Sequence, residues 1–144
     1  SSFSTWYLDD VRINGLSCVS LPEYYTVWAA EYGFDPYGAK GGMGDDYDGD
    51  GKSNDDEHTS GTDPTNPASY FVIADGGTRS PSEISLTIAV KSNRVYSVYR
   101  TTNLTATLPW SLFRQFTNLA NGDYEIFLTN SHPSHAYRIG VKIP

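Results

Sequence analysis

The sequence predicts a mainly β protein, an antiparallel β-sandwich preceded by a short helix and an acidic loop. Three observations support this fold class. Residues 69–144 contain six short apolar or alternating runs separated by turn residues, at the spacing of about ten residues that is typical of antiparallel sandwiches. Residues 23–32 have the periodicity of a short helix. Residues 45–63 hold eight acidic residues and one basic residue.

Length and cysteine content limit the class of protein. The chain has 144 residues and a formal net charge of -7, which allows one ordinary domain or two small ones. Its one cysteine, Cys18, excludes an internal disulfide framework and a cysteine-based zinc cluster. No apolar run approaches the roughly 18 residues that span a bilayer, so membrane insertion is not predicted.

The negative charge is concentrated in one segment. Residues 1–44 have a net charge of -3, residues 45–63 of -7 and residues 64–144 of +3. An acidic cluster of this density repels itself unless a cation fills it. The basic residues of the C-terminal part form no run, so nucleic-acid binding is not predicted either.

The N-terminal residues 1–22 contain a strand-like run, WYLDDVRI at residues 6–13, which ends at an Asn-Gly turn. This run resembles the closing strand of jelly-roll modules in secreted carbohydrate-active proteins, which implies a strand or linker from a preceding module. A strand that belongs to this domain is the alternative.

The expected helix at residues 23–32 is followed by the stop signal Gly33 and by a glycine-rich loop over residues 33–44. Its apolar face is predicted to consist of Tyr24, Val27, Trp28 and Tyr32. The helix and this loop lead the chain into the acidic segment.

Residues 46–57, DYDGDGKSNDDE, match the twelve-residue calcium loop D-x-[DN]-x-[DN]-G-x5-E at every constrained position. Alternating aspartates aim their carboxylates into one turn of the chain, and Gly51 at position 6 permits the bend. Glu57 at position 12 is long enough to bind the same ion through both of its carboxylate oxygens. The predicted ligands are Asp46, Asp48, Asp50, Lys52 through its backbone carbonyl, Asn54 and Glu57.

Calcium is the ion that this loop favours. Ca²⁺ takes roughly six to eight oxygen ligands, whereas Mg²⁺ is usually bound through about one or two carboxylates. A solvated acidic loop is the alternative, but it would need neither Gly51 at position 6 nor Glu57 at position 12. The sequence therefore predicts an EF-hand-like loop with Ca²⁺ as its cofactor.

The residues after the loop differ from those of an ordinary EF-hand. The exiting helix, which begins near Asn54, is short because Ser60 is followed at once by Gly61 and the run GTDPTNP. Residues 46–67, DYDGDGKSNDDEHTSGTDPTNP, resemble the bacterial thrombospondin type 3 repeat. Dockerin modules share the loop but carry it twice, so cohesin docking is not implied.

The resemblance implies an arrangement found in secreted or surface proteins of environmental bacteria, in which a helix and a calcium repeat precede a C-terminal β-module. It implies a secreted or cell-surface location and neighbouring domains in a longer chain. Three parts are expected: residues 1–22, the helix and calcium repeat at 23–68, and the sandwich at 69–144.

The sandwich is predicted to contain strands at Tyr70–Ala74, Ile84–Val90, Val95–Arg100, Trp110–Phe116, Tyr124–Leu128 and Tyr137–Ile143. Turn signals lie between them at residues 75–77, 92–93, 108–109, 121–123 and 132–133. Residues 96–113 and 136–143 resemble the β-module that follows the repeat in these bacterial proteins, which implies that Tyr96, Trp110 and Tyr137 are core residues.

No catalytic constellation is predicted. No spacing pairs the acids of the C-terminal part, and the nucleophile motif G-x-S-x-G is absent. His132 and His135 lie in a proline-containing turn and are interpreted as loop histidines rather than zinc ligands. The chain is therefore expected not to be an enzyme, with a place as the C-terminal accessory part of a carbohydrate-active enzyme left open.

The eleven tyrosines suggest a different role, because exposed aromatic rings stack on sugar faces and basic side chains bind carboxylated or sulfated glycans. The carbohydrate-binding candidates are Tyr99, Arg100, Arg114 and Tyr124. The alternative is that the tyrosines flank the core and the bases are scattered surface charges.

Two function classes remain open at this point. The first is a noncatalytic calcium-binding accessory module of a larger secreted bacterial protein, which binds polysaccharide, with an anionic glycan favoured. The second is a calcium-rigidified structural spacer or adhesion module of a cell-surface protein.

Overall fold

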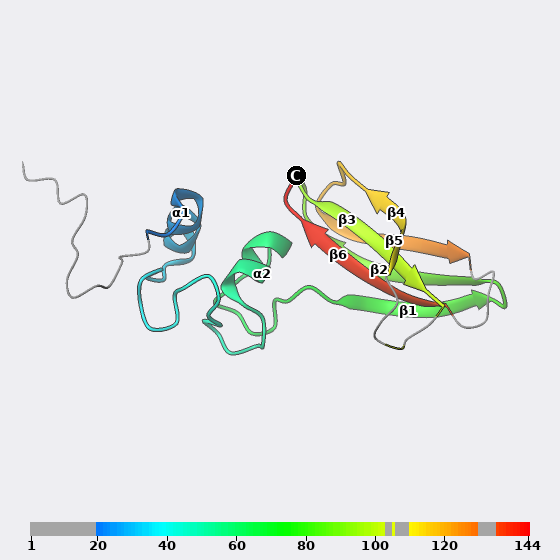
Figure 1. Ribbon diagram of the computed structural model, residues 1–144, viewed down its shortest axis with the longest axis horizontal. Coiled ribbons are helices and arrows are strands. Elements are labelled where there is room, and N and C mark those ends of the chain that lie inside the picture. Colours follow the sequence, from blue (N-terminus) through cyan, green and yellow to red (C-terminus); the bar gives the residue numbers. More distant parts are fainter. Residues whose placement is uncertain (1–19, 103–104, 106–109, 130–134) are drawn as a thin grey trace, which may run out of the picture.

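The computed structural model describes residues 20–102, 105, 110–129 and 135–144, and Figure 1 shows the helices at one end and the strands at the other. The elements in these residues are α1 (Glu23–Tyr32), α2 (Asn54–Ser60), β1 (Ile73–Ser80), β2 (Glu83–Val90), β3 (Val95–Thr101), β4 (Ser111–Phe116), β5 (Gly122–Thr129) and β6 (Ala136–Lys142). No helix in the described ranges is long and apolar enough to cross a membrane.

The strands form two antiparallel three-stranded sheets, with the orders β1-β2-β5 and β4-β3-β6. Alternate residues of each central strand face the other sheet, because successive side chains of a strand point to opposite faces. The shared core holds Ile88, Val90, Tyr96, Val98, Ile126 and Leu128. The mainly β fold class, a β-sandwich preceded by a short helix, is therefore confirmed.

The first strand is the one that the sequence places wrongly. We expected a strand at residues 70–74 and a turn at residues 75–77, but β1 runs through all three of these turn residues and the reversal falls after Ser80. Gly76 pairs with Leu86, and a Cβ on Gly76 would lie 3.2 Å from a methyl group of Leu86. The glycine thus accommodates a large side chain on the neighbouring strand and does not turn the chain.

Two of the three expected core aromatics lie in the core. Tyr96 is fully buried, its hydroxyl accepts a hydrogen bond from the Lys91 amide at 2.7 Å, and Tyr137 packs against the cluster from its edge. Trp110 is not part of this cluster, and the Arg138 guanidinium lies 4.9 Å from its ring centroid. The prediction for Trp110 is wrong because its position in the chain does not reveal which face of the sheet it occupies.

Helix α1 has the predicted bounds but a different buried face. The buried residues are Tyr25, Trp28 and Ala29, whereas Tyr24 and Val27 are each about half exposed. Phe34 completes this second cluster, with Leu21, Tyr32 and Met43 at its edge. The expected face was one residue out of phase, because several large apolar residues on a short helix allow more than one stripe.

Helix α2 is connected to both neighbours. The His58 ring packs between Tyr24 and Trp28 of α1, at centroid distances of 5.1 and 5.2 Å. On the other side, Arg94 in the β2–β3 turn donates hydrogen bonds to the carbonyls of Thr59, at 2.5 Å, and of His58, at 2.9 Å. The acidic loop is thereby placed beside the sandwich.

Some expectations lie outside the described residues. These are the strand-like run at residues 6–13, Cys18, the turn at residues 108–109 and His132. The proposed division into 1–22, 23–68 and 69–144 also stays a prediction, although the helices lie before residue 68 and the strands after it.

Candidate metal site

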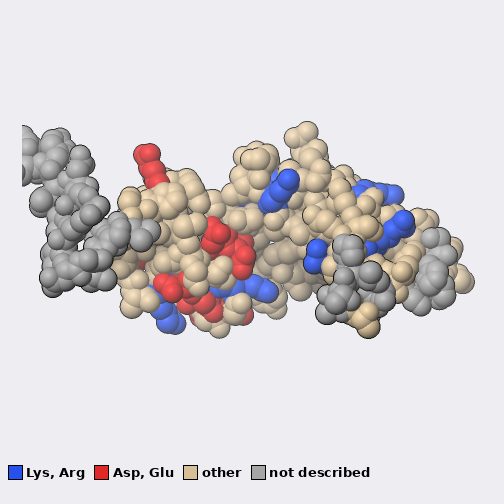
Figure 2. Space-filling view, viewed as in Figure 1, with Lys and Arg blue, Asp and Glu red and all other residues tan. Residues whose placement is uncertain are grey.

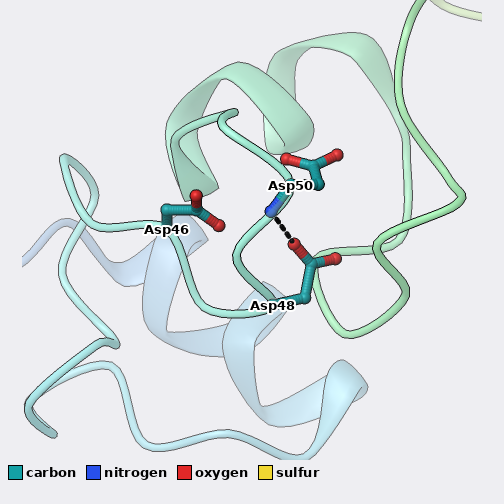
Figure 3. A group of neighbouring side chains, drawn as sticks. All are labelled: Asp46, Asp48 and Asp50. Carbon is teal, nitrogen blue, oxygen red and sulfur yellow. Dashed lines mark hydrogen bonds between the residues drawn. The ribbon is translucent and has the colours of Figure 1, made fainter.

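Three aspartates form the centre of the acidic loop. Asp46, Asp48 and Asp50 each offer a carboxylate oxygen, and these oxygens lie within 4.8 Å of one another (Figure 3). Gly51 has φ +91°, so the bend expected at position 6 uses backbone that a side chain would strain. The three aspartates are therefore a group that could hold a metal ion.

The loop backbone orients each aspartate. Both oxygens of Asp46 accept amide hydrogen bonds, from Gly49 at 2.6 Å and from Gly51 at 2.9 Å. One oxygen of Asp48 accepts from the Asp50 amide at 3.1 Å, the dashed line of Figure 3, and one oxygen of Asp50 accepts from the Lys52 amide at 2.7 Å. The carboxylates are thus held in place by the chain itself.

Glu57, on α2, is not one of the residues whose oxygens lie within 4.8 Å of one another, although the charges of Asp48 and Asp50 act on it. It is almost completely buried, with 1% of its surface exposed. Its Oε1 accepts a hydrogen bond from the Thr62 hydroxyl at 3.3 Å. Its Oε2 is buried without a hydrogen-bond partner among the described residues, as are Oδ2 of Asp48 and Oδ2 of Asp50. Each of these three carboxylates therefore has one oxygen held by the protein and one that is left over.

The electrostatics of the loop reflect this crowding. Burial, and then the charges of Asp48 and Asp50, raise the pKa of Glu57 from 4.5 to about 7. Burial also raises the pKa of Asp48, and the charge of Asp50 adds to the increase. The amide hydrogen bonds from Gly51 and then Gly49 lower the pKa of Asp46, although partial desolvation opposes them. Without a counter-ion, the pKa of Glu57 therefore lies close to neutral pH, well above that of an ordinary carboxyl group.

Asn54 has a structural role besides the ligand role predicted for position 9. Its side-chain nitrogen donates to the carbonyls of Lys40, at 3.0 Å, and Gly42, at 2.8 Å, and its oxygen accepts from the Tyr47 amide at 3.1 Å. The residue is fully buried. Its carboxamide therefore connects the glycine-rich loop to the start of the acidic loop, and its ligation of a metal ion stays a prediction.

The glycine-rich loop is pinned at a second point. The Tyr25 hydroxyl of α1 donates a buried hydrogen bond to the Gly41 carbonyl at 2.7 Å. A Cβ on Gly41 would lie 1.8 Å from the carbonyl oxygen of Asp35, so only glycine fits there. The glycine-rich loop therefore packs against the acidic loop and supports it. Its amino-acid composition did not predict this role.

Lys52 lies where the loop meets the sandwich. Its side chain is exposed and lines a hollow of about 190 Å³ together with Phe71 and Val141. Its amide orients Asp50, as described above. Ligation through its backbone carbonyl stays a prediction.

The chemistry of these donors suits a hard divalent cation. The four carboxylates are acceptor groups when ionised, and an unpaired buried carboxylate oxygen is costly unless a proton or a cation satisfies it. Thr62 is not among the predicted site residues. Its hydroxyl donates a hydrogen bond to Oε1 of Glu57 and so orients the Glu57 side chain. The only sequence signal for Thr62 is its place in the run GTDP.

The four carbohydrate-binding candidates do not share one surface. Tyr99 projects from the outer face of the β4-β3-β6 sheet, opposite Arg138. Arg100 and Arg114 lie over the Phe113 ring at 4.5 and 5.6 Å, and Arg114 reaches the Phe127 carbonyl of the other sheet. The fourth candidate, Tyr124, is not an exposed ring. It packs against the core beside Phe116, at a centroid distance of 5.3 Å.

Comparison with known proteins returns no relative. No protein-family model matches the chain, no curated protein matches it in sequence and no solved structure matches it. The resemblance of residues 46–67 to the bacterial thrombospondin type 3 repeat remains a prediction from the sequence.

Proposed function

We propose that the chain is a noncatalytic accessory module of a larger secreted bacterial protein, in which Ca²⁺ completes the acidic loop. The observation that carries this proposal is the leftover buried oxygen on each of Asp48, Asp50 and Glu57. Asp46, whose pKa is lowered, stays ionised beside them. Four carboxylates suit Ca²⁺ better than Mg²⁺, which usually keeps several waters and uses about one or two carboxylates.

In this proposal calcium is structural. It would offset the repulsion among the acids and fix Glu57, and through Glu57 it would fix α2. Arg94 ties the last turn of α2 to the sandwich, which supports a stiff connection between the calcium loop and the strands. The alternative function is that of a calcium-rigidified spacer or adhesion module of a cell-surface protein. It requires the same stiff connection.

The decisive experiment is a calcium titration of chelator-treated protein by calorimetry. We expect one site per chain, with a dissociation constant of about 10⁻⁶ to 10⁻⁴ M and weaker binding of Mg²⁺. Glu57→Gln should weaken binding at least about tenfold, because it removes a charge and the grip of a bidentate ligand.

Asp56→Asn is the matched control. Asp56 is the exposed residue next to Glu57 on α2. Its substitution removes the same charge but leaves the carboxylates of the acidic loop unchanged. An equal loss in both variants would mean that calcium responds only to the overall charge of the segment. No calcium binding to the unchanged chain would overturn the proposal.

The accessory role includes polysaccharide binding, and the distribution of charge on the sandwich supports it over a purely structural spacer. Four of the seven basic residues of the C-terminal part lie on the β4-β3-β6 sheet, where aromatic residues accompany them.

A further inference from the structure

The two sheets of the sandwich carry opposite charge. The acidic residues of 64–144 all lie on the β1-β2-β5 sheet, which has Arg79 as its one basic residue; they are Asp75, Glu83, Asp123 and Glu125. Strands β3, β4 and β6 contain no acidic residue and four basic ones, Arg100, Arg114, Arg138 and Lys142. In the view of Figure 2, blue atoms are visible over the sandwich and red atoms gather over the acidic loop.

The outer face of the β4-β3-β6 sheet has a continuous row of side chains. Leu112, Tyr99 and Arg138 lie directly opposite one another on the three strands. On β3, the side chains of Tyr96 and Val98 point into the core. Because successive side chains of a strand point to opposite faces, Tyr99 lies on the outer face. Leu112 is 56% exposed, and Lys142 lies on the same face four residues beyond Arg138.

The Arg138 guanidinium contacts two aromatic rings. Its guanidinium carbon lies 5.0 Å from the Tyr99 centroid and 4.9 Å from the Trp110 centroid. Stacking on aromatic faces fixes the guanidinium plane while leaving its in-plane N–H groups available. Arg138 is exposed, and within the described ranges no hydrogen bond or ion pair engages those N–H groups.

Arg79, on the opposite sheet, differs from Arg138 in its charged partner. It also lies over an aromatic ring, that of Phe127, at 4.6 Å. Its guanidinium, however, is paired with Glu125 at 3.1 Å. The same kind of cation–aromatic contact is therefore neutralised by a carboxylate on one sheet, whereas on the other no residue that the structure describes pairs with the guanidinium.

We propose that Arg138, positioned by Tyr99 and Trp110, binds the anionic group of an acidic polysaccharide on the outer face of the β4-β3-β6 sheet. The inference rests on the polysaccharide-binding part of the proposed function and is independent of the calcium site. A preoriented guanidinium binds a carboxylate or sulfate through two parallel hydrogen bonds and loses little side-chain entropy in doing so.

The surface favours a sugar chain over other polyanions. Only Arg138 and Lys142 among the four bases project from this face, which is few for a nucleic acid that is bound mainly through its phosphates. The exposed Leu112 side chain and the edges of the two rings offer apolar surface to the faces of sugar rings.

The test uses three polymers with one backbone: dextran, carboxymethyl-dextran and dextran sulfate. Binding of the full chain, saturated with calcium, is measured by affinity electrophoresis and biolayer interferometry. We expect binding to one or both charged dextrans, none to neutral dextran, and weakening as salt rises from about 0.05 to 0.5 M. The charged polymer that binds identifies the anionic group as carboxylate or sulfate.

Arg138→Gln should lower the affinity at least about tenfold, because a charged hydrogen-bonding group is lost. Arg79→Gln, which removes the same charge and a comparable stack from the acidic sheet, is the matched control and should leave the affinity unchanged. Tyr99→Phe should retain binding and Tyr99→Leu should reduce it, which separates the positioning role of the ring from its hydroxyl. Unchanged melting temperatures show that each variant is folded.

Several results would overturn the inference. Equal losses in Arg138→Gln and Arg79→Gln would show attraction by net charge alone. Equal or tighter binding of poly-glutamate or duplex DNA would assign the face to another class of polyanion. If no dextran binds while calcium binding is intact, the inference and the polysaccharide role fail together, and the calcium-rigidified spacer stands.

Discussion

At the scale of single residues, Glu57 has the largest effect on the loop. It is sealed inside the protein beside two aspartates, and the protein satisfies one of its oxygens only. In the metal-free state it is most stable as the neutral acid, whereas a bound cation requires the carboxylate. The same residue therefore opposes folding at neutral pH and is, in the proposed calcium site, the ligand that calcium would have to ionise.

The first prediction concerns the stability of the calcium-free protein against pH. The folded pKa of Glu57 is raised to about 7 from 4.5, so below pH 4.5 the residue is protonated in both states. Between pH 4.5 and about 7 the unfolded chain loses this proton first, and the free energy of unfolding should fall by about 3 kcal/mol. Urea unfolding in chelator across this range measures the decrease.

Glu57→Gln serves as the control for this prediction. The amide does not titrate, so the variant should lose most of the pH dependence and should be more stable than the unchanged chain at pH 7.5 in chelator. A decrease of the same size in the variant would assign the effect to other acids of the loop.

Asn54 gives the second prediction. Asn54→Ala leaves the Tyr47 amide and the carbonyls of Lys40 and Gly42 without their partner. Thermal unfolding in chelator should show a loss of about 2 to 4 kcal/mol, because these are buried groups. Glu57→Gln should weaken calcium binding more than Asn54→Ala does, whereas only the latter should destabilise the calcium-free protein. A normal melting temperature for Asn54→Ala in chelator would refute the structural role.

At the scale of elements, α2 depends on its ends. A helix of seven residues is marginal by itself. The Ser53 hydroxyl accepts a hydrogen bond from the Asp56 amide at its start, and three acids in the first turn suit the helix dipole. At its other end the charged Arg94 side chain satisfies two of the last carbonyls. The turn between β2 and β3 thus stabilises the helix that carries Glu57.

The third prediction removes this contact. Arg94→Gln should lower the free energy of unfolding by about 1 to 2 kcal/mol, through the lost charged hydrogen bonds and the lost interaction with the helix dipole. The readout is urea unfolding at saturating calcium. Lys91→Gln changes an exposed charge in the same turn and should have little effect. If the two variants are equally stable, Arg94 does not cap α2 in solution.

At the scale of the whole molecule, the two apolar clusters are separate. One surrounds α1 and the other fills the sandwich, and α2 with its Arg94 contact lies between them. The sandwich therefore has its own core, while the acidic loop relies on α1, the glycine-rich loop and α2. We expect calcium to act as an architectural ion and not as a switch, because α2 is short and the chain has a single methionine, Met43, so that no methionine-rich surface could be exposed.

The fourth prediction follows from this arrangement. Removing calcium should shift or broaden the amide resonances of residues 20–67 and of the turn at residues 91–94. The resonances of Ile126 and Leu128, which belong to the sandwich core, should stay where they are. Loss of dispersion across the β5 signals on chelation would contradict the independence of the sandwich.

Features whose causes are local could be predicted from the amino-acid sequence. The bounds of α1, the bend at Gly51 and the short α2 are set by residues within one or two turns of each other, and the acidic pattern of residues 46–57 specifies its own loop. Five of the six strands were predicted near their observed positions, because alternation and turn residues are also local signals.

Which side chains contact one another depends on packing between segments that lie far apart in the sequence. Asn54 is bound by backbone more than ten residues away, and Thr62 reaches Glu57 only once α2 has ended. Arg138 meets Tyr99 through strand register and Trp110 across the sheet, and β4 carries a bulge opposite Val98 and Tyr99 that changes which residues share a face. Register and bulges depend on pairing between distant segments, and a one-residue shift moves a side chain to the opposite face.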